Sequence, residues 1–288
     1  MRLASLSIYP VKSGAGIALE EAELRPDGLA GDRRWMVVDA DGAFVTQRAL
    51  PMLARLKATP EEGGLRLSLD GESLAVPVPG PDAPHIAVRV WRDDLVLPQA
   101  PAAAPWLSRL CGLPLRLVHQ PTGTIRPVSA EWGAAGDRVS LADGFPLLVT
   151  TTASLEALRA AGGEAMAPVD MGRFRPNLVV EGSMHWAEDG WARLSVGGIE
   201  LDLVKPCARC VMTTTDQTLG VVAGDEPLKM LRRLRRSGDG RVPGLLFGWN
   251  AVPRGQGMLR VGDAVEVLAT REPWPVLRKA DRTAAPAD

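Results

Sequence analysis

Residues 194–210 read Leu194-Ser195-Val196-Gly197-Gly198-Ile199-Glu200-Leu201-Asp202-Leu203-Val204-Lys205-Pro206-Cys207-Ala208-Arg209-Cys210. Apolar and polar residues alternate on both sides of Gly197-Gly198, which is typical of two antiparallel strands joined by a two-residue turn. The second strand, from Ile199 to Val204, leads into a segment with two cysteines. Because proline cannot donate a hydrogen bond to a sheet, Pro206 is expected to end that strand. The stretch therefore predicts a hairpin that presents two thiols at its end.

Two further hairpins are predicted in the first half of the chain. Their turns are Asp41-Gly42, between apolar runs at 35–38 and 44–45, and Asp70-Gly71, between runs at 65–69 and 74–76. These patterns favour a largely antiparallel sheet. The 30 Gly and 24 Pro of the chain indicate short, bent strands, which suit a barrel better than a long open sheet.

Helices are expected to be few and short. Apolar residues recur every three or four positions in the segments Ala102–Cys111, Ala153–Ala161 and Pro227–Arg236. The last segment ends in Arg232, Arg233, Arg235 and Arg236. Such a basic run complements the helix dipole, or alternatively forms a docking patch for an acidic redox partner. The predicted class is α+β, predominantly β.

Composition limits the function classes. The formal net charge is −1, from 33 basic and 34 acidic residues mixed along the chain, so nothing favours binding to nucleic acid. Residues 2–9 are too short and too alternating for a signal-peptide core, and no apolar run approaches the roughly 18 residues of a membrane span. Three cysteines are too few for a disulfide framework. A cytoplasmic protein with no membrane contact is expected.

The length of 288 residues predicts two modules. Segments rich in Pro, Ala or Gly lie at Pro98–Pro105 and Gln120–Asp137, and they place the boundary near residue 118. The expected units are residues 1–118, residues 119–270 and a flexible tail at 271–288, which is charged and rich in Ala and Pro from Lys279 onward.

The cysteine segment suggests a metal site. A thiolate is a ligand for soft or thiophilic metals, and Cys207 and Cys210 stand at the end of a predicted strand. A structural zinc site would need further ligands, but the chain has no second C-x-x-C, and its histidines lack a metal-binding spacing. A thioredoxin-like redox pair should open a helix, whereas this pair follows a hairpin. Cys111 lies on an apolar stripe and is expected to be a packed thiol.

Several short motifs occur in a fixed order along the chain. They are Ile8-Tyr9-Pro10-Val11-Lys12-Ser13, Gly31-Asp32-Arg33-Arg34-Trp35, Phe174-Arg175-Pro176-Asn177, Cys207-Ala208-Arg209-Cys210, Leu246-Phe247-Gly248 and Arg260-Val261-Gly262-Asp263. Together they resemble the MOSC proteins, named after the molybdenum cofactor sulfurase C-terminal domain. The resemblance is greatest to the amidoxime-reducing components and their bacterial counterparts. It covers about residues 1–269.

The resemblance implies a fold, an activity and a site. The fold is an antiparallel β-barrel MOSC domain packed on an N-terminal MOSC-associated β-barrel module. The activity is molybdenum-cofactor-dependent reduction of hydroxylamines, amidoximes and N-hydroxylated bases. Cys210 would be the catalytic residue and the ligand of molybdenum, and Cys207 a neighbour that shapes the turn. The residues implied to bind the phosphate-bearing molybdopterin are Lys12, Ser13, Arg33, Arg175, Asn177 and Ala208.

Two differences from relatives refine the expectation. No cysteine follows Cys210, so an iron–sulfur domain of the kind that some relatives append is not expected, and electrons should come from a separate ferredoxin- or flavin-type protein. The membrane anchor of eukaryotic relatives is also not evident. Asp216 follows the ligand and could either relay protons or form a turn. Two alternative functions stay open: a protein that binds the cofactor or carries sulfur without turnover, and a structural barrel without cofactor.

Overall fold

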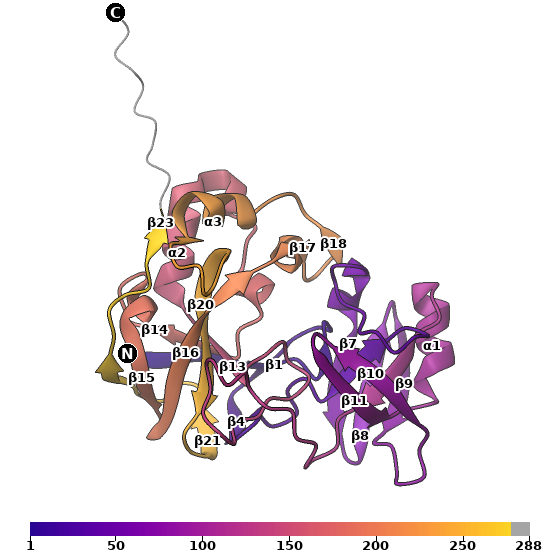
Figure 1. The fold of residues 1–288 in the computed structure, drawn as a ribbon. Coiled ribbons are helices and arrows are strands. Elements are labelled where there is room, and N and C mark those ends of the chain that lie inside the picture. Colours follow the sequence, from indigo (N-terminus) through magenta and orange to yellow (C-terminus); the bar gives the residue numbers. More distant parts are fainter. Residues whose placement is uncertain (278–288) are drawn as a thin grey trace, which may run out of the picture.

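A ten-stranded sheet dominates the computed structural model, which describes residues 1–277 (Figure 1). The strand order is β22 (Val265–Thr270), β15 (Trp191–Val196), β16 (Ile199–Arg209), β20 (Leu245–Pro253), β13 (Leu147–Thr151), β14 (Leu178–Glu181), β1 (Arg2–Ile8) and β3 (Ile17–Leu19), with β19 (Arg236–Ser237) on β20 and β23 (Val276–Leu277) on β19. All neighbours are antiparallel except β13 and β14. The predicted class, α+β and predominantly β, is confirmed.

The sheet curls without closing into a continuous ladder. Its end strands β3 and β22 do not pair with each other. Instead, the Leu3 N–H donates to the Asp263 carbonyl at 2.9 Å and the Val265 N–H donates to the Met1 carbonyl at 3.0 Å. From Leu6 onward β1 pairs with β3. Of residues 1–8, only residues 1–3 therefore form hydrogen bonds with the segment beside β22, at the other end of the sheet. The expected barrel is therefore met only loosely.

The main core fills the inside of this curl. Its members come from alternate positions of the paired strands. Six of them have side chains that are at most 1% exposed: Leu3, Leu147, Leu194, Leu201, Leu203 and Trp249. Alternate burial is what a strand with one face toward a core produces. The polar–apolar alternation of the sequence thus predicted the inward face correctly.

The hairpin at Gly197-Gly198 is confirmed, but the predicted end of its second strand is wrong. Both glycines have positive φ, 56° and 83°, which a two-residue hairpin turn requires. Strand β16 continues past Pro206 to Arg209. Pairing with β15 ends at Asp202, and the ladder with β20 is irregular between Pro206 and Ala208. At an unpaired edge and a bulge, the missing N–H of proline costs no ladder bond.

Smaller sheets form the other lobe, at the right of Figure 1. They are β7 (Lys57–Glu61) with β8 (Gly64–Leu69) and β9 (Glu72–Pro77), β10 (His85–Val90) with β11 (Asp93–Pro98), and β12 (Arg116–His119) with β6 (Trp35–Val38) and β2 (Val11–Lys12). The hairpin at Asp70-Gly71 is confirmed, and that at Asp41-Gly42 is a single bridge between Val38 and Phe44. Cys111 is half-buried against an apolar cluster, and burial raises the pKa of its thiol.

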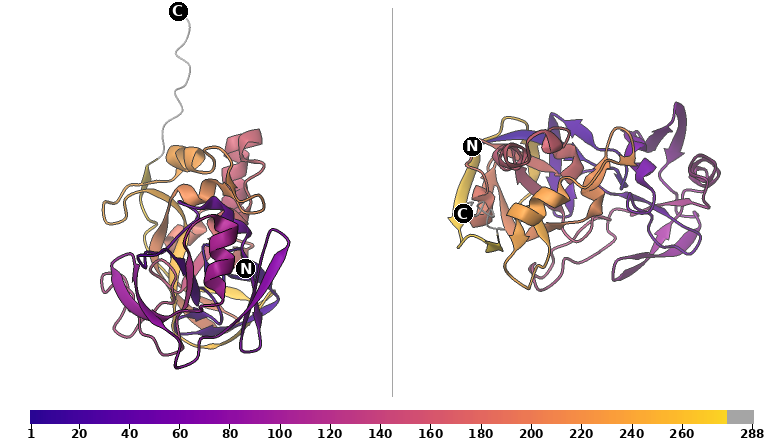
Figure 2. Two further views of the ribbon diagram at one scale, coloured as in Figure 1. Left: turned by 90° about the vertical axis from the view of Figure 1, so that its right-hand side faces the viewer. Right: turned by 90° about the horizontal axis from the view of Figure 1, so that it is seen from above.

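The two lobes share strands. β1 belongs to the large sheet, and β21 (Gly257–Arg260) pairs with β4 (Glu21–Arg25), which pairs with β5 (Gly28–Leu29). Viewed from above, the indigo N-terminal strand lies among the strands of the second half (Figure 2). The division at residue 118 stays a prediction. Of the expected tail, residues 278–288 lie outside the described part, while Trp274 is buried and β23 pairs with β19.

The three predicted helices are confirmed. They are α1 (Ala103–Cys111), α2 (Thr152–Gly162) and α3 (Leu228–Leu234), beside the short 3-10 helices η1 (Pro51–Arg55), η2 (Gly163–Met166), η3 (Met171–Phe174), η4 (Ala187–Gly190) and η5 (Val211–Thr214). α3 is shorter than expected. Arg235 lies beyond its end, is 2% exposed and pairs with Asp189 at 2.7 Å, so only part of the basic run lies on a helix. Among residues 1–277, no helix is long and apolar enough to cross a membrane.

Candidate functional site

One cleft collects all the residues that the sequence analysis proposed for the site. Its volume is about 130 Å³, and its lining includes Lys12, Ser13, Arg33, Arg175, Asn177, Ala208 and Cys210. These residues come from the end of β2, the turn before β6, the segment between η3 and β14, and the end of β16. Distant parts of the chain therefore converge here. The individual roles of the residues stay predictions.

The cleft is strongly cationic. Five basic side chains line it, Lys12, Arg33, Arg173, Arg175 and Arg209, against the single carboxylate of Asp143. Such an excess favours an anionic ligand. The sequence analysis did not propose Arg173, Arg209 or Asp143. Arg209 could have been found, because it stands between the two cysteines, whereas Arg173 and Asp143 carry no comparable signal.

Three lining residues have a left-handed backbone. The φ angles of Ser13, Arg33 and Arg175 are 65°, 48° and 55°, a region that costs residues other than glycine about 1–3 kcal/mol each. Backbone hydrogen bonds hold two of them: the Arg33 N–H donates to the Tyr9 carbonyl at 2.9 Å and the Arg175 N–H to the Gly172 carbonyl at 3.0 Å. Strain of this kind gathers at functional sites, so its location supports the cleft as the site.

Arg33 is aimed by buried polar neighbours. Its Nη1 donates to Asp32 Oδ2 at 2.7 Å and to Asn177 Oδ1 at 3.0 Å. Asp32 is 1% exposed and Asn177 2%. The Asn177 amide also accepts from the Leu148 N–H at 3.2 Å and donates to the Ser7 carbonyl at 3.1 Å. Asn177 thus holds Arg33 in place and keeps little capacity for a direct contact to a ligand.

Tyr9 packs against both central arginines. The Arg33 and Arg175 guanidinium carbons lie 4.4 Å and 4.1 Å from the centre of its ring. Its hydroxyl donates to the Pro176 carbonyl at 3.0 Å, and burial raises the pKa of Tyr9 to about 12. Burial lowers the pKa of Arg175 to about 10, and the charge of Arg33 acts in the same direction. At neutral pH the phenol is therefore neutral and Arg175 is still charged.

Arg175 leaves a donor without a partner. Its Nη1 donates to the Gly14 carbonyl at 2.7 Å, but its buried Nη2 contacts no acceptor within residues 1–277. Arg209 Nε is unpaired in the same way. A buried donor without a partner costs about 1–3 kcal/mol, so an acceptor supplied by a ligand would be strongly favoured. The cleft therefore fits an anion with several oxygen atoms.

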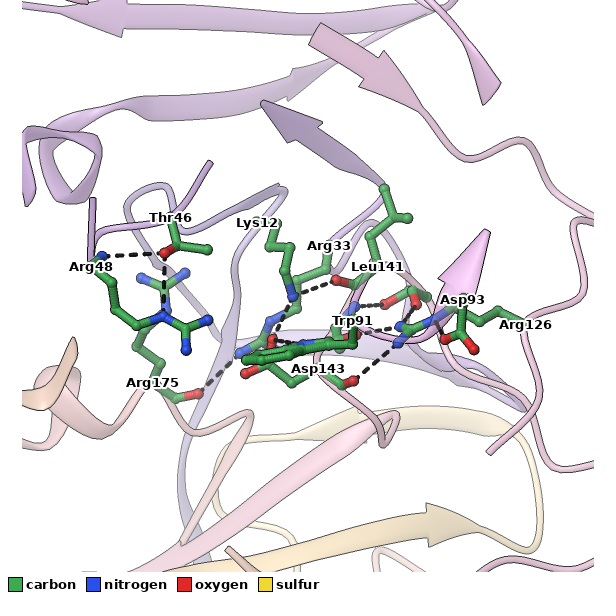
Figure 3. A network of polar contacts seen from close by, with 12 residues as sticks. Lys12, Arg33, Thr46, Arg48, Trp91, Asp93, Arg126, Leu141, Asp143 and Arg175 are labelled. Carbon is green, nitrogen blue, oxygen red and sulfur yellow. Dashed lines mark hydrogen bonds and ion pairs between the residues drawn. The ribbon is translucent and has the colours of Figure 1, made fainter. Parts of the chain in front are cut away.

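Lys12 reaches the cleft through a connected network (Figure 3). Its Nζ donates to the Leu141 carbonyl at 2.9 Å and pairs with Asp143 at 2.5 Å, and Asp143 also accepts from Trp91 Nε1 at 3.2 Å. Burial lowers the pKa of Lys12, and the Asp143 carboxylate acts in the opposite direction. Arg126 fixes the same segment, because its Nη2 donates to the Asp143 carbonyl at 3.0 Å.

The two cysteines differ in their surroundings. Cys210 is exposed at the start of η5, while Cys207 is half-buried and its Sγ accepts from Arg209 Nη1 at 2.9 Å. In an extended strand, residues three apart are separated by roughly 10 Å, beyond the reach of a disulfide. The thioredoxin-like interpretation is therefore unsupported. The zinc interpretation lacks ligands, since no three His, Cys, Asp or Glu side chains of residues 1–277 gather as a metal site.

Asp216 forms a turn. Its Oδ1 accepts from the N–H groups of Thr218 and Leu219 at 2.9 Å and 2.8 Å, and its Oδ2 lies 3.7 Å from Arg173 Nη2. A side chain that accepts from backbone N–H groups two and three residues ahead is a local turn-former. These contacts favour the structural interpretation of Asp216.

Comparison with known proteins shows the family. Residues 1–114 match the MOSC N-terminal beta barrel domain and residues 136–266 match the MOSC domain. The chain is 34% identical over 286 residues to mitochondrial amidoxime-reducing component 1 of Homo sapiens, which covers 92% of this chain and 82% of that protein. It is 33% identical over 278 residues to mitochondrial amidoxime reducing component 2 of Homo sapiens, with 91% and 82% covered.

Among solved structures, the YuaD protein of Bacillus subtilis aligns with 92% of this chain and 93% of its own, at 11% identity and a TM-score of 0.42. The family assignment rests on the sequence matches, which span nearly the whole chain. The resemblance seen in the sequence motifs is thereby confirmed. The protein belongs to the MOSC family of the amidoxime-reducing components.

Proposed function

We propose that this protein is a molybdenum-cofactor-dependent oxidoreductase that reduces N-hydroxylated compounds such as hydroxylamines, amidoximes and N-hydroxylated bases. The observation that carries the proposal is the exposed thiol of Cys210 in the lining of a cleft with five basic side chains. The names of its relatives point to amidoximes. The reaction breaks the N–O bond, consumes two electrons and two protons, and releases water and the reduced nitrogen compound.

The residues present fit the cofactor. Cys210 would hold the molybdenum, and Lys12, Ser13, Arg33 and Arg175 would hold the phosphate of the pterin, with Asn177 aiming Arg33 and Ala208 next to the ligand loop. The unpaired Arg175 Nη2 matches a phosphate oxygen. The bound cofactor supplies the two-electron redox chemistry of molybdenum. The chain itself binds and orients the cofactor, and a separate ferredoxin- or flavin-type protein delivers the electrons.

One prediction concerns the anion site alone. Arg175→Lys should weaken binding of inorganic phosphate to the cofactor-free protein about tenfold, because lysine cannot replace the planar donor pair of arginine. One charge-assisted hydrogen bond is worth about 1.5–3 kcal/mol, and about 1.4 kcal/mol is tenfold in affinity. Isothermal titration calorimetry measures the change. Arg109→Lys, on the exposed face of α1, is the matched control and should leave affinity unchanged.

The proposed function is tested on the protein from a host that makes molybdenum cofactor. Elemental analysis should find near-stoichiometric molybdenum, and benzamidoxime should be reduced to benzamidine with reduced methyl viologen as the electron source. Protein from a host that cannot make the pterin should contain no molybdenum and show no turnover. Zinc alone, or a folded protein without metal from the competent host, would refute the proposal.

A further inference from the structure

A second hollow begins one residue beyond Cys210. This groove has a volume of about 390 Å³, and its lining includes Arg48, Val211, Thr214, Val222, Leu228 and Arg232. η5 separates it from the cleft, because Val211 and Thr214 face the groove while Met212 and Thr213 face the cleft. Cys210 stands at the start of η5 and is exposed, so a molecule that contacts Cys210 is within reach of the groove.

The floor of the groove is apolar and exposed. Val211 is 54% exposed and Val222 is 62% exposed, and the partly buried Leu228 lies beside them. Because Val211 and Val222 lie in one hollow rather than singly, they offer an apolar surface to a bound molecule. A volume of this size is in the range of small-molecule pockets, roughly 300–1,000 Å³. The groove therefore suits the body of a small substrate.

Two arginines of the groove have no carboxylate partner within residues 1–277. Arg48 comes from the other lobe and Arg232 from α3, and both are exposed. Some exposed arginines elsewhere on the surface pair with acids, as Arg66 does with Glu61 and Arg109 with Glu72. Asp225 is the one carboxylate in the lining, against two guanidinium groups. The groove thus has an excess of positive charge.

Arg48 is also held in place (Figure 3). Its Nε donates weakly to Thr46 Oγ1 at 3.4 Å, and its guanidinium carbon lies 4.7 Å from the centre of the Trp91 ring. Trp91 is itself fixed, since its indole N–H donates to Asp143 and its ring centre lies 5.3 Å from that of Phe44. A side chain ordered before binding loses less conformational entropy when it binds an anion.

We propose that Arg48 and Arg232 form a subsite for a negatively charged group of the substrate, so that the protein prefers N-hydroxylated compounds that carry a carboxylate or a phosphate-like group on an apolar body. The inference rests on the proposed function, and it specifies the substrate class of the same site. The apolar body lies on Val211 and Val222, and the charged group contacts the two arginines. An acidic electron-transfer protein could use the same charges, and the experiment separates the two occupants.

The test compares benzamidoxime with its 4-carboxy and 4-phosphono derivatives, with reduced methyl viologen as the electron source. Contacts to exposed charges are worth roughly two- to fivefold each, so kcat/KM for the charged substrates should exceed that for benzamidoxime about tenfold. The ratio should fall in Arg48→Gln and Arg232→Gln, and should approach one in the double variant and in 0.5 M salt. The larger ratio of the two derivatives identifies the preferred anion.

The controls make each outcome decisive. Arg109→Gln should keep the wild-type ratio, and kcat/KM for neutral benzamidoxime should stay within about twofold in every variant. Turnover without a charge preference, or a preference that survives the double substitution, would overturn the inference. So would an unchanged ratio combined with slower reduction of the variants by a reduced acidic [2Fe–2S] ferredoxin, because the groove would then bind the donor. Absence of all turnover despite bound molybdenum would instead refute the proposed function.

Discussion

Cys210→Ala is expected to remove molybdenum from the purified protein and to lower amidoxime reduction by more than about a hundredfold. Loss of a supporting group around a metal site typically costs 10–100-fold, and loss of the ligand itself should exceed that. The lysine and arginine side chains of the cleft are hydrogen-bond donors without a free lone pair for a metal, so they cannot replace the thiolate. Because Cys210 is exposed, its truncation leaves no internal cavity, so the cofactor-free variant and the cofactor-free wild type should have the same melting temperature. Elemental analysis and steady-state kinetics measure the two losses.

Cys207→Ala provides the matched control. Cys207 is three residues away, lines the same cleft and contacts Arg209, yet it should not be needed for the metal. The variant should therefore keep most of its molybdenum and its turnover. If Cys207→Ala instead lost bound sulfane sulfur while Cys210→Ala kept both metal and folding, the protein would be a sulfur carrier rather than a reductase.

Glu188→Gln is expected to remove one component of the pH dependence of stability, the loss that Glu188 causes as the pH rises from about 4.5 to about 7.5. Glu188 is 1% exposed, its Oε1 has no partner among the described residues, and its Oε2 lies 3.3 Å from Thr151 Oγ1. Burial raises the pKa of Glu188 to about 7, and the charge of Asp189 adds to the shift. A neutral carboxylic acid is therefore the stable form in the folded protein near neutral pH and below.

The sign follows from proton linkage. The folded state holds the Glu188 proton more tightly than the unfolded chain, whose carboxyl titrates near its model value of 4.5. This contribution to stability is complete below about pH 4.5 and is lost as the pH rises through about 7. One pKa unit corresponds to about 1.4 kcal/mol, so the free energy of unfolding falls by roughly 3 kcal/mol. A neutral glutamine at this position does not titrate and causes no such loss.

Urea unfolding at pH 5 and pH 8 measures this difference. The free energy of unfolding of Glu188→Gln should gain roughly 2–3 kcal/mol relative to wild type between the two pH values. Glu156→Gln, at an exposed position of α2, should follow the wild-type curve. If the free energy of unfolding of Glu188→Gln changed between pH 5 and pH 8 by the same amount as that of the wild type, Glu188 would not hold its proton more tightly in the folded state.

Local patterns predicted local structure well. Alternation around Gly197-Gly198 and Asp70-Gly71 gave two hairpins because such turns depend only on a few adjacent residues. The same logic failed at Pro206, because whether a missing N–H matters depends on which strand lies alongside. It also failed at Arg235, whose burial against Asp189 is a tertiary contact. Helix ends are set by such contacts as much as by propensity.

The sequence predicted which residues belong to the site, but not how they are arranged in space. The motif resemblance supplied Lys12, Arg33, Arg175 and Cys210, which line one cleft. No pattern indicated the left-handed backbone of Arg33 and Arg175, because basic residues adopt it only when the surrounding structure enforces it. Asp143 was missed for a similar reason: its partner Lys12 is 131 residues away, and only the folded chain brings them together.

The placement of β1 in the large sheet affects how the chain can fold during synthesis. The partner of Arg2 in β14 is Glu181, and residues 1–3 also bond to residues 262–265. β3 follows β1 directly, but β1 emerges from the ribosome long before β14 and residues 262–265 exist, so the core around Leu3, Leu6 and Ile8 is still incomplete. Contacts so distant in sequence form late and slowly. A nascent chain must keep this apolar strand from aggregating until almost the whole polypeptide is complete, which makes chaperone supply a determinant of the yield of active protein.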